Sequence, residues 1–286
     1  MIILSEPEVV VRARSTVGEG PVLDPRTGRL CWVDIVEGAL FQSDLSTGED
    51  AASRMPTMLG AAVPRAEREG FAVAVSDGFG LFADDGLVLV DRALPEASRR
   101  MNDAACDSKG RLWAGSTHVD FAPGGGALHR WDGGRSAVVD SGFTLPNGMG
   151  WSPDDTTMYL IDSVEHTVLA AEFRADDGWV GAFDQAFAVE GGLPDGMCVD
   201  LDGCLWIAVW GGSEVRRYSP RGELLARVAM PVEKPSSCCF GTDGTLFITS
   251  ASAELSEAEL AEQPLAGSVF AVSTSARGVP VRSFAG

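Results

Sequence analysis

The segment Gly110-Arg111-Leu112-Trp113-Ala114-Gly115-Ser116 is a turn glycine followed by a β-rich run, and related strings recur along the chain. With this one counted, the six copies lie at 28–35, 70–77, 110–116, 157–163, 203–208 and 244–250. Their aligned positions, about 40 to 47 residues apart, are Trp32, Val73, Trp113, Tyr159, Trp206 and Phe247. Four short strands fill such a period. The sequence therefore predicts an all-β fold, a six-bladed β-propeller with a central channel.

The segments between these runs fit the same architecture. Asp107 to Gly110 and Asp200 to Gly203 are hairpin signals, because Asp bonds its own backbone and Gly tolerates positive φ. Only 252–262 favours a helix. No interdomain linker interrupts the series, so we expect one domain over residues 1–286. A terminal strand at 9–13, beside 279–284, would close the ring and remove exposed edges.

Composition excludes several classes of protein. The chain has 22 Lys and Arg against 41 Asp and Glu, a formal net charge of -19, and no basic patch. Such a surface repels phosphate backbones and anionic lipid, so we expect no nucleic-acid and no membrane partner. No apolar run reaches the length of a membrane span, and the start lacks the pattern of a signal peptide, which makes a cytoplasmic location the default. The sequence carries no signal for an oligomeric state.

The cysteines do not indicate a metal site or a disulfide framework. None of the six belongs to a Cys-x-x-Cys pair, and the chain has only three histidines. We therefore expect reduced, buried thiols. The sequence also lacks a nucleophile elbow, a His-Glu-x-x-His motif, a P-loop and a dinucleotide fingerprint.

A second repeat carries polar residues. Leu145-Pro146-Asn147-Gly148-Met149 is nearly repeated as Leu193-Pro194-Asp195-Gly196-Met197. A carboxamide and a carboxylate thus occupy the same slot in two repeats, and around a common axis both would point at one centre. The simpler interpretation of each Asx-Gly pair is turn chemistry at the end of a loop. It explains less easily why both pairs follow Leu-Pro and precede Met.

Four motifs occur in the order found in the regucalcin and gluconolactonase family, which includes luciferin-regenerating enzyme and sugar lactonases. They are Gly18-Glu19-Gly20-Pro21, Arg100-Met101-Asn102-Asp103, Leu145-Pro146-Asn147-Gly148 and 194–200. The chain resembles this family over essentially its whole length. The resemblance implies a six-bladed propeller with one divalent cation at the mouth of its channel. It also implies metal ligands at Glu19, Asn147 and Asp195, substrate contacts at Arg100 and Asn102, and Asp195 as the general base.

The implied ligand set has a chemistry of its own. One Asn and two carboxylates are all-oxygen donors that suit a hard cation, with Ca²⁺ first, and Mg²⁺, Mn²⁺, Zn²⁺ or Fe²⁺ as alternatives. Three protein ligands leave positions open for water and substrate. The resulting hypothesis is a metal-dependent hydrolase that opens a sugar lactone, its small-molecule partner, to the aldonic acid, with Asp195 taking a proton from water.

Other interpretations stay open at this point. The same site could act on a non-sugar lactone or an organophosphate ester, or the propeller could be a non-enzymatic calcium-binding regulator. Asp103 could orient Arg100 or Asn102, or cap a turn. His118 follows a predicted strand end and is a candidate for the pocket, although a lone histidine is more often structural. Trp210 could form an apolar wall for a sugar ring or pack between blades.

Overall fold

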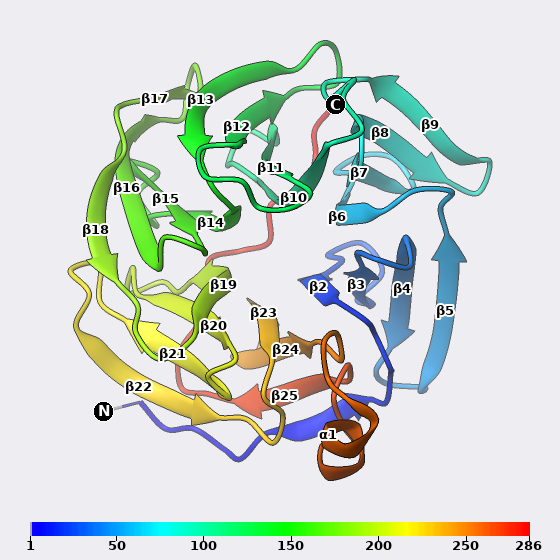
Figure 1. The fold of residues 1–286 in the computed structure, drawn as a ribbon, viewed down its shortest axis with the longest axis vertical. Coiled ribbons are helices and arrows are strands. Elements are labelled where there is room, and N and C mark those ends of the chain that lie inside the picture. The colour runs from blue at the N-terminus through cyan, green and yellow to red at the C-terminus, as the bar shows by residue number, and fades with distance from the viewer. Residues whose placement is uncertain (1) are drawn as a thin grey trace.

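The computed structural model describes residues 2–286 as six β-sheets arranged around a central channel, with one short helix (Figure 1). The first three blades contain strands β2 to β13. The first blade is β2 (Gly18–Leu23), β3 (Leu30–Asp34), β4 (Ala39–Asp44) and β5 (Glu49–Arg54). The second is β6 (Leu59–Pro64), β7 (Phe71–Val75), β8 (Gly78–Ala83) and β9 (Gly86–Asp91). The third is β10 (Arg99–Cys106), β11 (Leu112–His118), β12 (Gly126–Trp131) and β13 (Ala137–Phe143).

The other three blades contain the rest of the strands. The fourth is β14 (Pro146–Trp151), β15 (Thr157–Asp162), β16 (Thr167–Arg174) and β18 (Asp184–Ala188), with β17 (Trp179–Val180) also paired to β16. The fifth is β19 (Leu193–Val199), β20 (Leu205–Trp210), β21 (Glu214–Tyr218) and β22 (Leu224–Ala229). The sixth is β23 (Pro235–Phe240), β24 (Thr245–Ser250), β25 (Val269–Ser273) and β1 (Glu8–Val11). The predicted six-bladed propeller is confirmed.

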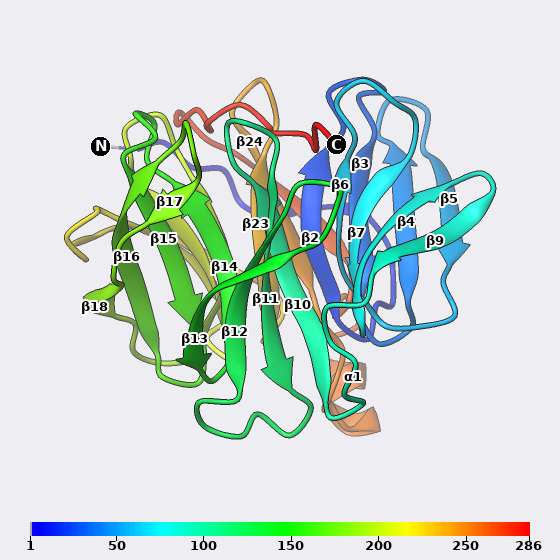
Figure 2. The ribbon, with the colours of Figure 1, turned by 90° about the horizontal axis from the view of Figure 1, so that it is seen from above.

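Ring closure differs in one part from the prediction. The N-terminal strand does close the last blade, because β1 pairs antiparallel with β25 and Glu8 lies opposite Ala271. Segment 279–284 is not its partner. It crosses the end of the channel opposite α1 (Glu257–Glu262), as Figure 2 shows, and its backbone binds several blades: the Phe284 N–H donates to the Pro64 carbonyl at 2.9 Å. Pro280 has no N–H to offer a ladder, which suits a cross-connection better than a strand.

The repeat is real, but its register slips in the first two copies. In the first three blades the second strand begins at Leu30, Phe71 and Leu112, and each of these residues pairs with the last residue of the innermost strand. Cys31 and Ala72 are therefore the equivalents of Trp113, and the alignment of Trp32 and Val73 with it was wrong by one residue. A slip of one residue reverses the face of the sheet. Trp32 accordingly packs against Val269 and Phe247, towards the sixth blade.

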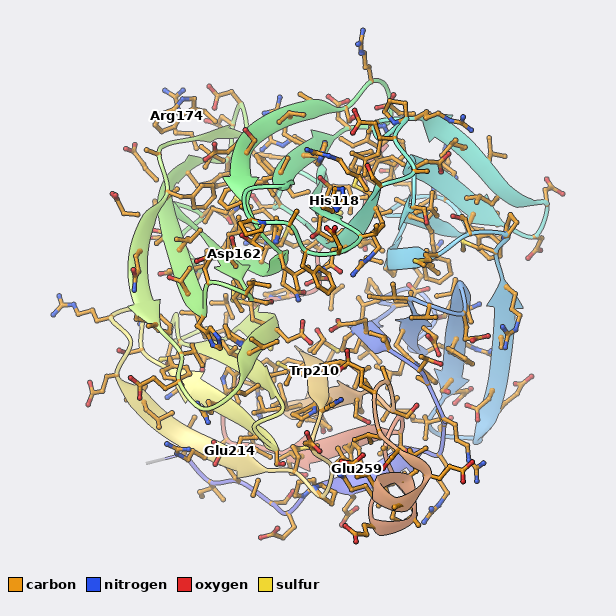
Figure 3. All side chains as sticks on the ribbon, in the orientation of Figure 1. His118, Asp162, Arg174, Trp210, Glu214 and Glu259 are labelled. Atoms are coloured by element: carbon orange, nitrogen blue, oxygen red, sulfur yellow. The ribbon has the colours of Figure 1, made fainter. Side chains whose placement is uncertain are left out.

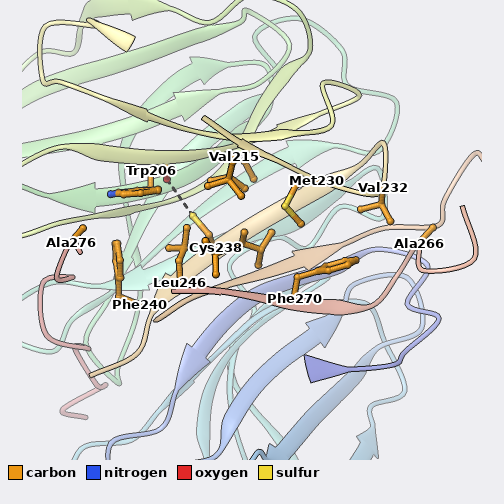
Figure 4. Packing of buried hydrophobic residues seen from close by; sticks show 14 residues of the cluster. Trp206, Val215, Met230, Val232, Cys238, Phe240, Leu246, Ala266, Phe270 and Ala276 are labelled. Carbon is orange, nitrogen blue, oxygen red and sulfur yellow. Dashed lines mark hydrogen bonds between the residues drawn. The ribbon is translucent and has the colours of Figure 1, made fainter. Parts of the chain in front are cut away.

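The hydrophobic core consists of clusters between neighbouring blades. Between the fifth and sixth blades, Trp206 meets Phe240 edge-on at 5.6 Å and packs with Leu246 and Phe270 (Figure 4). The Trp206 Nε1–H donates to Asp200 Oδ2 at 3.0 Å, so the hairpin aspartate also satisfies the buried indole. All six cysteines are free thiols. No helix of residues 2–286 is long and apolar enough to cross a membrane.

Candidate active site

The site residues lie at irregularities in the innermost strands. In all six of these strands the pairing with the next strand shifts partway along, between Glu19 and Val22 in β2, for example, and between Pro194 and Met197 in β19. A β-bulge re-aims the side chains of its strand. The shifts contain or begin at Glu19, Asn102, Asn147 and Asp195, and all four line the same cavity in the channel. The bulges therefore turn residues of four blades towards one point.

The glycines that follow Asn147 and Asp195 are required for packing. Asn147-Gly148 and Asp195-Gly196 lie inside β14 and β19, so the interpretation as loop turns was wrong. A Cβ on Gly148 would lie 2.5 Å from the Asp195 carbonyl oxygen, and one on Gly196 would lie 2.4 Å from the Ser237 Cβ. Each glycine lets the next innermost strand approach at the height of the bulge.

The cavity has a volume of about 290 Å³. Its polar part, which we call the floor, consists of Glu19, Arg100, Asn102, Asp103, Asn147, Ser163 and Asp195. The Asn147 Nδ2 donates to Ser163 Oγ at 3.0 Å and also to Asp195 Oδ1. The Arg100 Nη1 donates to Asn102 Oδ1 at 2.7 Å, and the Asn102 Nδ2 donates to the Pro146 carbonyl at 3.2 Å. The structure thus brings together all five residues assigned by resemblance, and hydrogen bonds fix the two amides.

The floor concentrates buried negative charge. Burial, with repulsion from Asp195 and Asp103, raises the pKa of Glu19 well above its ordinary value. Burial and repulsion from Asp103 raise the pKa of Asp195 to about 8, and burial raises the pKa of Asp103 to about 6. Arg100 is the cationic side chain that lies among them. Carboxylates in such surroundings either hold protons or share a cation.

This donor set fits a hard divalent cation. Glu19, Asp195 and the Asn147 amide converge on the floor and supply only oxygen as donor. Within residues 2–286, no group of three or more His, Cys, Asp and Glu side chains is arranged to hold a metal. A cation here would therefore depend on the Asn147 carboxamide together with the carboxylates. Its charge would also offset the repulsion that raises their pKa values.

Asp34 and Asp162 accept hydrogen bonds from the backbone just before two of the bulged strands, β2 and β14. The Asp162 carboxylate accepts from the Thr144 N–H at 2.7 Å and from the Leu145 N–H at 2.8 Å, directly before β14. Asp34 accepts from the Thr16 N–H at 2.6 Å, before β2. Both carboxylates are buried at the end of the second strand of their blade, and Figure 3 shows Asp162 near the channel. These contacts position Asn147 and Glu19 indirectly.

The remaining candidates divide between the cavity and the surface. Trp210 lines the cavity, whereas His118 is not among its lining residues and pairs with Asp120 on an exposed loop. Asp103 makes no hydrogen bond to Arg100 or Asn102; it accepts from the Ala104 N–H at 2.8 Å. Sequence reasoning missed Ser163 and Phe121. Ser163 ends one of the six recurring runs, which is a usable signal, but nothing in the sequence singles out Phe121.

The order of these residues along the chain matches a known family model. The SMP-30/Gluconolactonase/LRE-like region matches residues 17–252. The chain belongs to this family. The matched region contains every polar residue of the cavity floor from Glu19 to Asp195, and all six innermost strands.

Individual relatives of the SMP-30/gluconolactonase/LRE-like family are similar over nearly their whole length. A 6-deoxy-6-sulfogluconolactonase of Pseudomonas putida is 36% identical, with 97% of this chain and 98% of the relative covered. An L-arabinolactonase of Azospirillum brasilense is 32% identical, with 96% and 93% covered. The crystal structure of a calcium-binding protein, regucalcin, from Agrobacterium tumefaciens superimposes with a TM-score of 0.91 at 25% identity, over 99% of this chain and 97% of that one.

Proposed function

We propose that this chain hydrolyses a sugar lactone to the aldonic acid with the help of one divalent cation. The observation that carries the proposal is the convergence of Glu19, Asn147 and Asp195, from three blades, on a cavity that also contains Arg100 and Asn102. Two of the similar proteins are named as a 6-deoxy-6-sulfogluconolactonase and an L-arabinolactonase. A cavity of about 290 Å³ has room for a single sugar ring.

The residues of the floor divide the chemistry. A bound cation would supply positive charge where the lactone carbonyl oxygen becomes negative. Glu19, Asn147 and Asp195 would hold it. Asp195 takes a proton from the attacking water and returns it to the ring oxygen when the C–O bond breaks, so the step is balanced. Arg100 and Asn102 orient the substrate by bonds to its oxygens; the guanidinium keeps donors free beyond its contacts to Asn102 and Met101.

An activity assay with metal control tests the proposal. Chelator-treated full-length protein would be assayed on hexono- and pentonolactones before and after addition of Ca²⁺, Mg²⁺, Mn²⁺ or Zn²⁺. We expect turnover only with a cation, and a loss of about 10³-fold in kcat for Asp195→Asn, since one group would lose both roles. Asp176→Asn is the control, because the Asp176 side chain is 97% exposed and does not line the cavity. Metal-independent turnover, or an active Asp195→Asn variant, would refute the mechanism.

A second candidate is a calcium-binding protein without catalysis. The observation in its favour is the similarity to a structure described as a calcium-binding protein. Against it, Arg100 and Asn102 are held at the cavity floor, where a binder of cations alone has no use for a guanidinium. Calorimetry with Ca²⁺ and a lactone together separates the two, because a pure binder takes up the ion without the heat of lactone turnover.

A further inference from the structure

The cavity above the polar floor has apolar walls. Three of the exposed large hydrophobic side chains of the protein lie around its mouth: Val36, Met58 and Phe121, which are 48%, 40% and 42% exposed. Val36 follows β3 of the first blade, Met58 lies in the connection from the first blade to the second, and Phe121 follows β11 of the third blade. Leu193 and Trp210 complete the wall from the fifth blade. Exposed apolar side chains that gather at one cavity mark a binding surface rather than chance exposure.

Phe121 is held at the mouth by its loop. Its backbone has a φ of +56°, a conformation that a bulky residue rarely adopts and that often marks a functional position. The Phe121 N–H donates to the His118 carbonyl at 2.9 Å, and the Ala122 N–H donates to Asp120 Oδ1 at 3.1 Å. The Arg100 guanidinium carbon lies 5.9 Å from the centre of the phenyl ring. The ring is thus placed directly beside the floor.

Trp210 is held in place by Lys234. The Lys234 Nζ lies 5.3 Å from the centre of the indole ring and donates to the Ala253 carbonyl at 2.8 Å. Figure 3 shows Trp210 beside the channel. Phe121 from the third blade and Trp210 from the fifth blade therefore both line the cavity.

The charges of the cavity disfavour an anionic substrate. Glu19, Asp103 and Asp195 outnumber Arg100 on the floor, and the charged side chain at the rim, Glu254, is also an acid, on a chain with a formal net charge of -19. Lys234 is already paired with Glu254 at 3.3 Å. A charged distal group would meet carbon at the wall and the Glu254 carboxylate at the rim, and a distal hydroxyl would find few partners there.

We propose that the site selects uncharged lactones whose distal end is apolar, such as 6-deoxy- or 6-O-alkyl-hexonolactones, with Phe121 and Trp210 as specificity-determining residues. This inference rests on the proposed lactonase function. The floor binds the carbonyl and the nearer ring oxygens, and the apolar wall contacts the end of the substrate that does not react. An apolar pocket discriminates against one added hydroxyl by about 10- to 100-fold.

Matched substrates and variants test this selection. The full chain, loaded with the cation that gives turnover, would be assayed on a hexonolactone, its 6-deoxy analogue and its 6-phosphate. We expect kcat/KM for the 6-deoxy compound to exceed that for the hexonolactone by at least about tenfold, and the phosphate to be the poorest. Phe121→Ser should bring the first ratio close to one, whereas Phe121→Leu should keep most of it. Val138→Ser, at an outer strand residue that is 61% exposed, is the control and should change nothing.

The possible failures are distinguishable. Equal or better hydrolysis of the hexonolactone or the phosphate, or an unchanged ratio in Phe121→Ser, overturns this inference and leaves the lactonase function standing. Absence of turnover with these three compounds and with the hexono- and pentonolactones of the first assay, with every cation, overturns the proposed function, and this inference with it.

Discussion

Replacing Gly148 by alanine tests whether the close approach of β14 and β19 sets the position of Asp195. A Cβ at residue 148 would lie 2.5 Å from the Asp195 carbonyl oxygen and 2.6 Å from the Met197 nitrogen. Ordinary contacts begin near 3.4 Å, so the two strands must separate by about 1 Å. Both obstacles are backbone atoms, and no side-chain rotation relieves them.

The cost has two parts. Overpacking of this kind lowers the free energy of unfolding by about 1 to 3 kcal/mol. Displacement of Asp195 by about 1 Å disturbs a residue that must contact both substrate and cation, and a misplacement of that size costs about 100-fold in rate. We therefore expect a moderately destabilised protein whose kcat/KM falls far more than its stability explains.

Two measurements check this expectation. Urea unfolding, followed by tryptophan fluorescence, gives the stability, and lactone hydrolysis at a saturating cation concentration gives kcat/KM. Gly134→Ala is the matched control, because a Cβ there meets no atom within 4 Å, and it should behave as the wild type. If Gly148→Ala keeps wild-type stability and turnover, the bulges do not position the site as we argue.

Three further predictions concern stability. Asp162→Ala leaves the buried Thr144 and Leu145 N–H groups without their acceptor, which should lower the free energy of unfolding in chemical denaturation by about 3 kcal/mol. A decrease below about 1 kcal/mol would contradict the role of Asp162 in holding the segment before β14. Phe284 is buried against Trp131, with ring centres 4.8 Å apart, so Phe284→Ala should lower the free energy of unfolding by about 3 to 5 kcal/mol. A variant of unchanged stability would show that segment 279–284 does not stabilise the propeller at this end of the channel. Burial lowers the pKa of His129 to about 4, so its folded form is neutral while the unfolded chain takes up a proton below about pH 6.5. Stability should therefore be complete above that pH and fall as the pH drops towards 4, by about 3 kcal/mol in all, and His129→Gln should flatten this slope; an unchanged slope would place the proton uptake elsewhere.

The agreement between sequence and structure is closest where the sequence repeats. Six recurring runs with hairpin signals suffice for six blades, because each blade must alternate short apolar runs with turns in every copy. The slots of Asn147 and Asp195 were recognisable for the same reason. The errors came where the repeat is degenerate. The other four copies have an aromatic residue at the equivalent position, whereas the first two have Cys31 and Ala72 there, and Trp32 and Val73 follow one residue later, so the sequence pattern favoured the wrong register.

By itself the sequence determined the architecture and the residue types of the floor, because both are repeated or occur in ordered motifs. The tertiary structure alone decided that Asn147-Gly148 and Asp195-Gly196 are bulges within strands, since a bulge depends on the pairing of two strands. It also decided that 279–284 crosses the channel end instead of joining a sheet, and that Asp103 is buried beside Glu19 and Asp195. Phe121 at the mouth is the clearest case, because its place depends on a loop conformation and on a guanidinium 21 residues earlier in the chain, at Arg100.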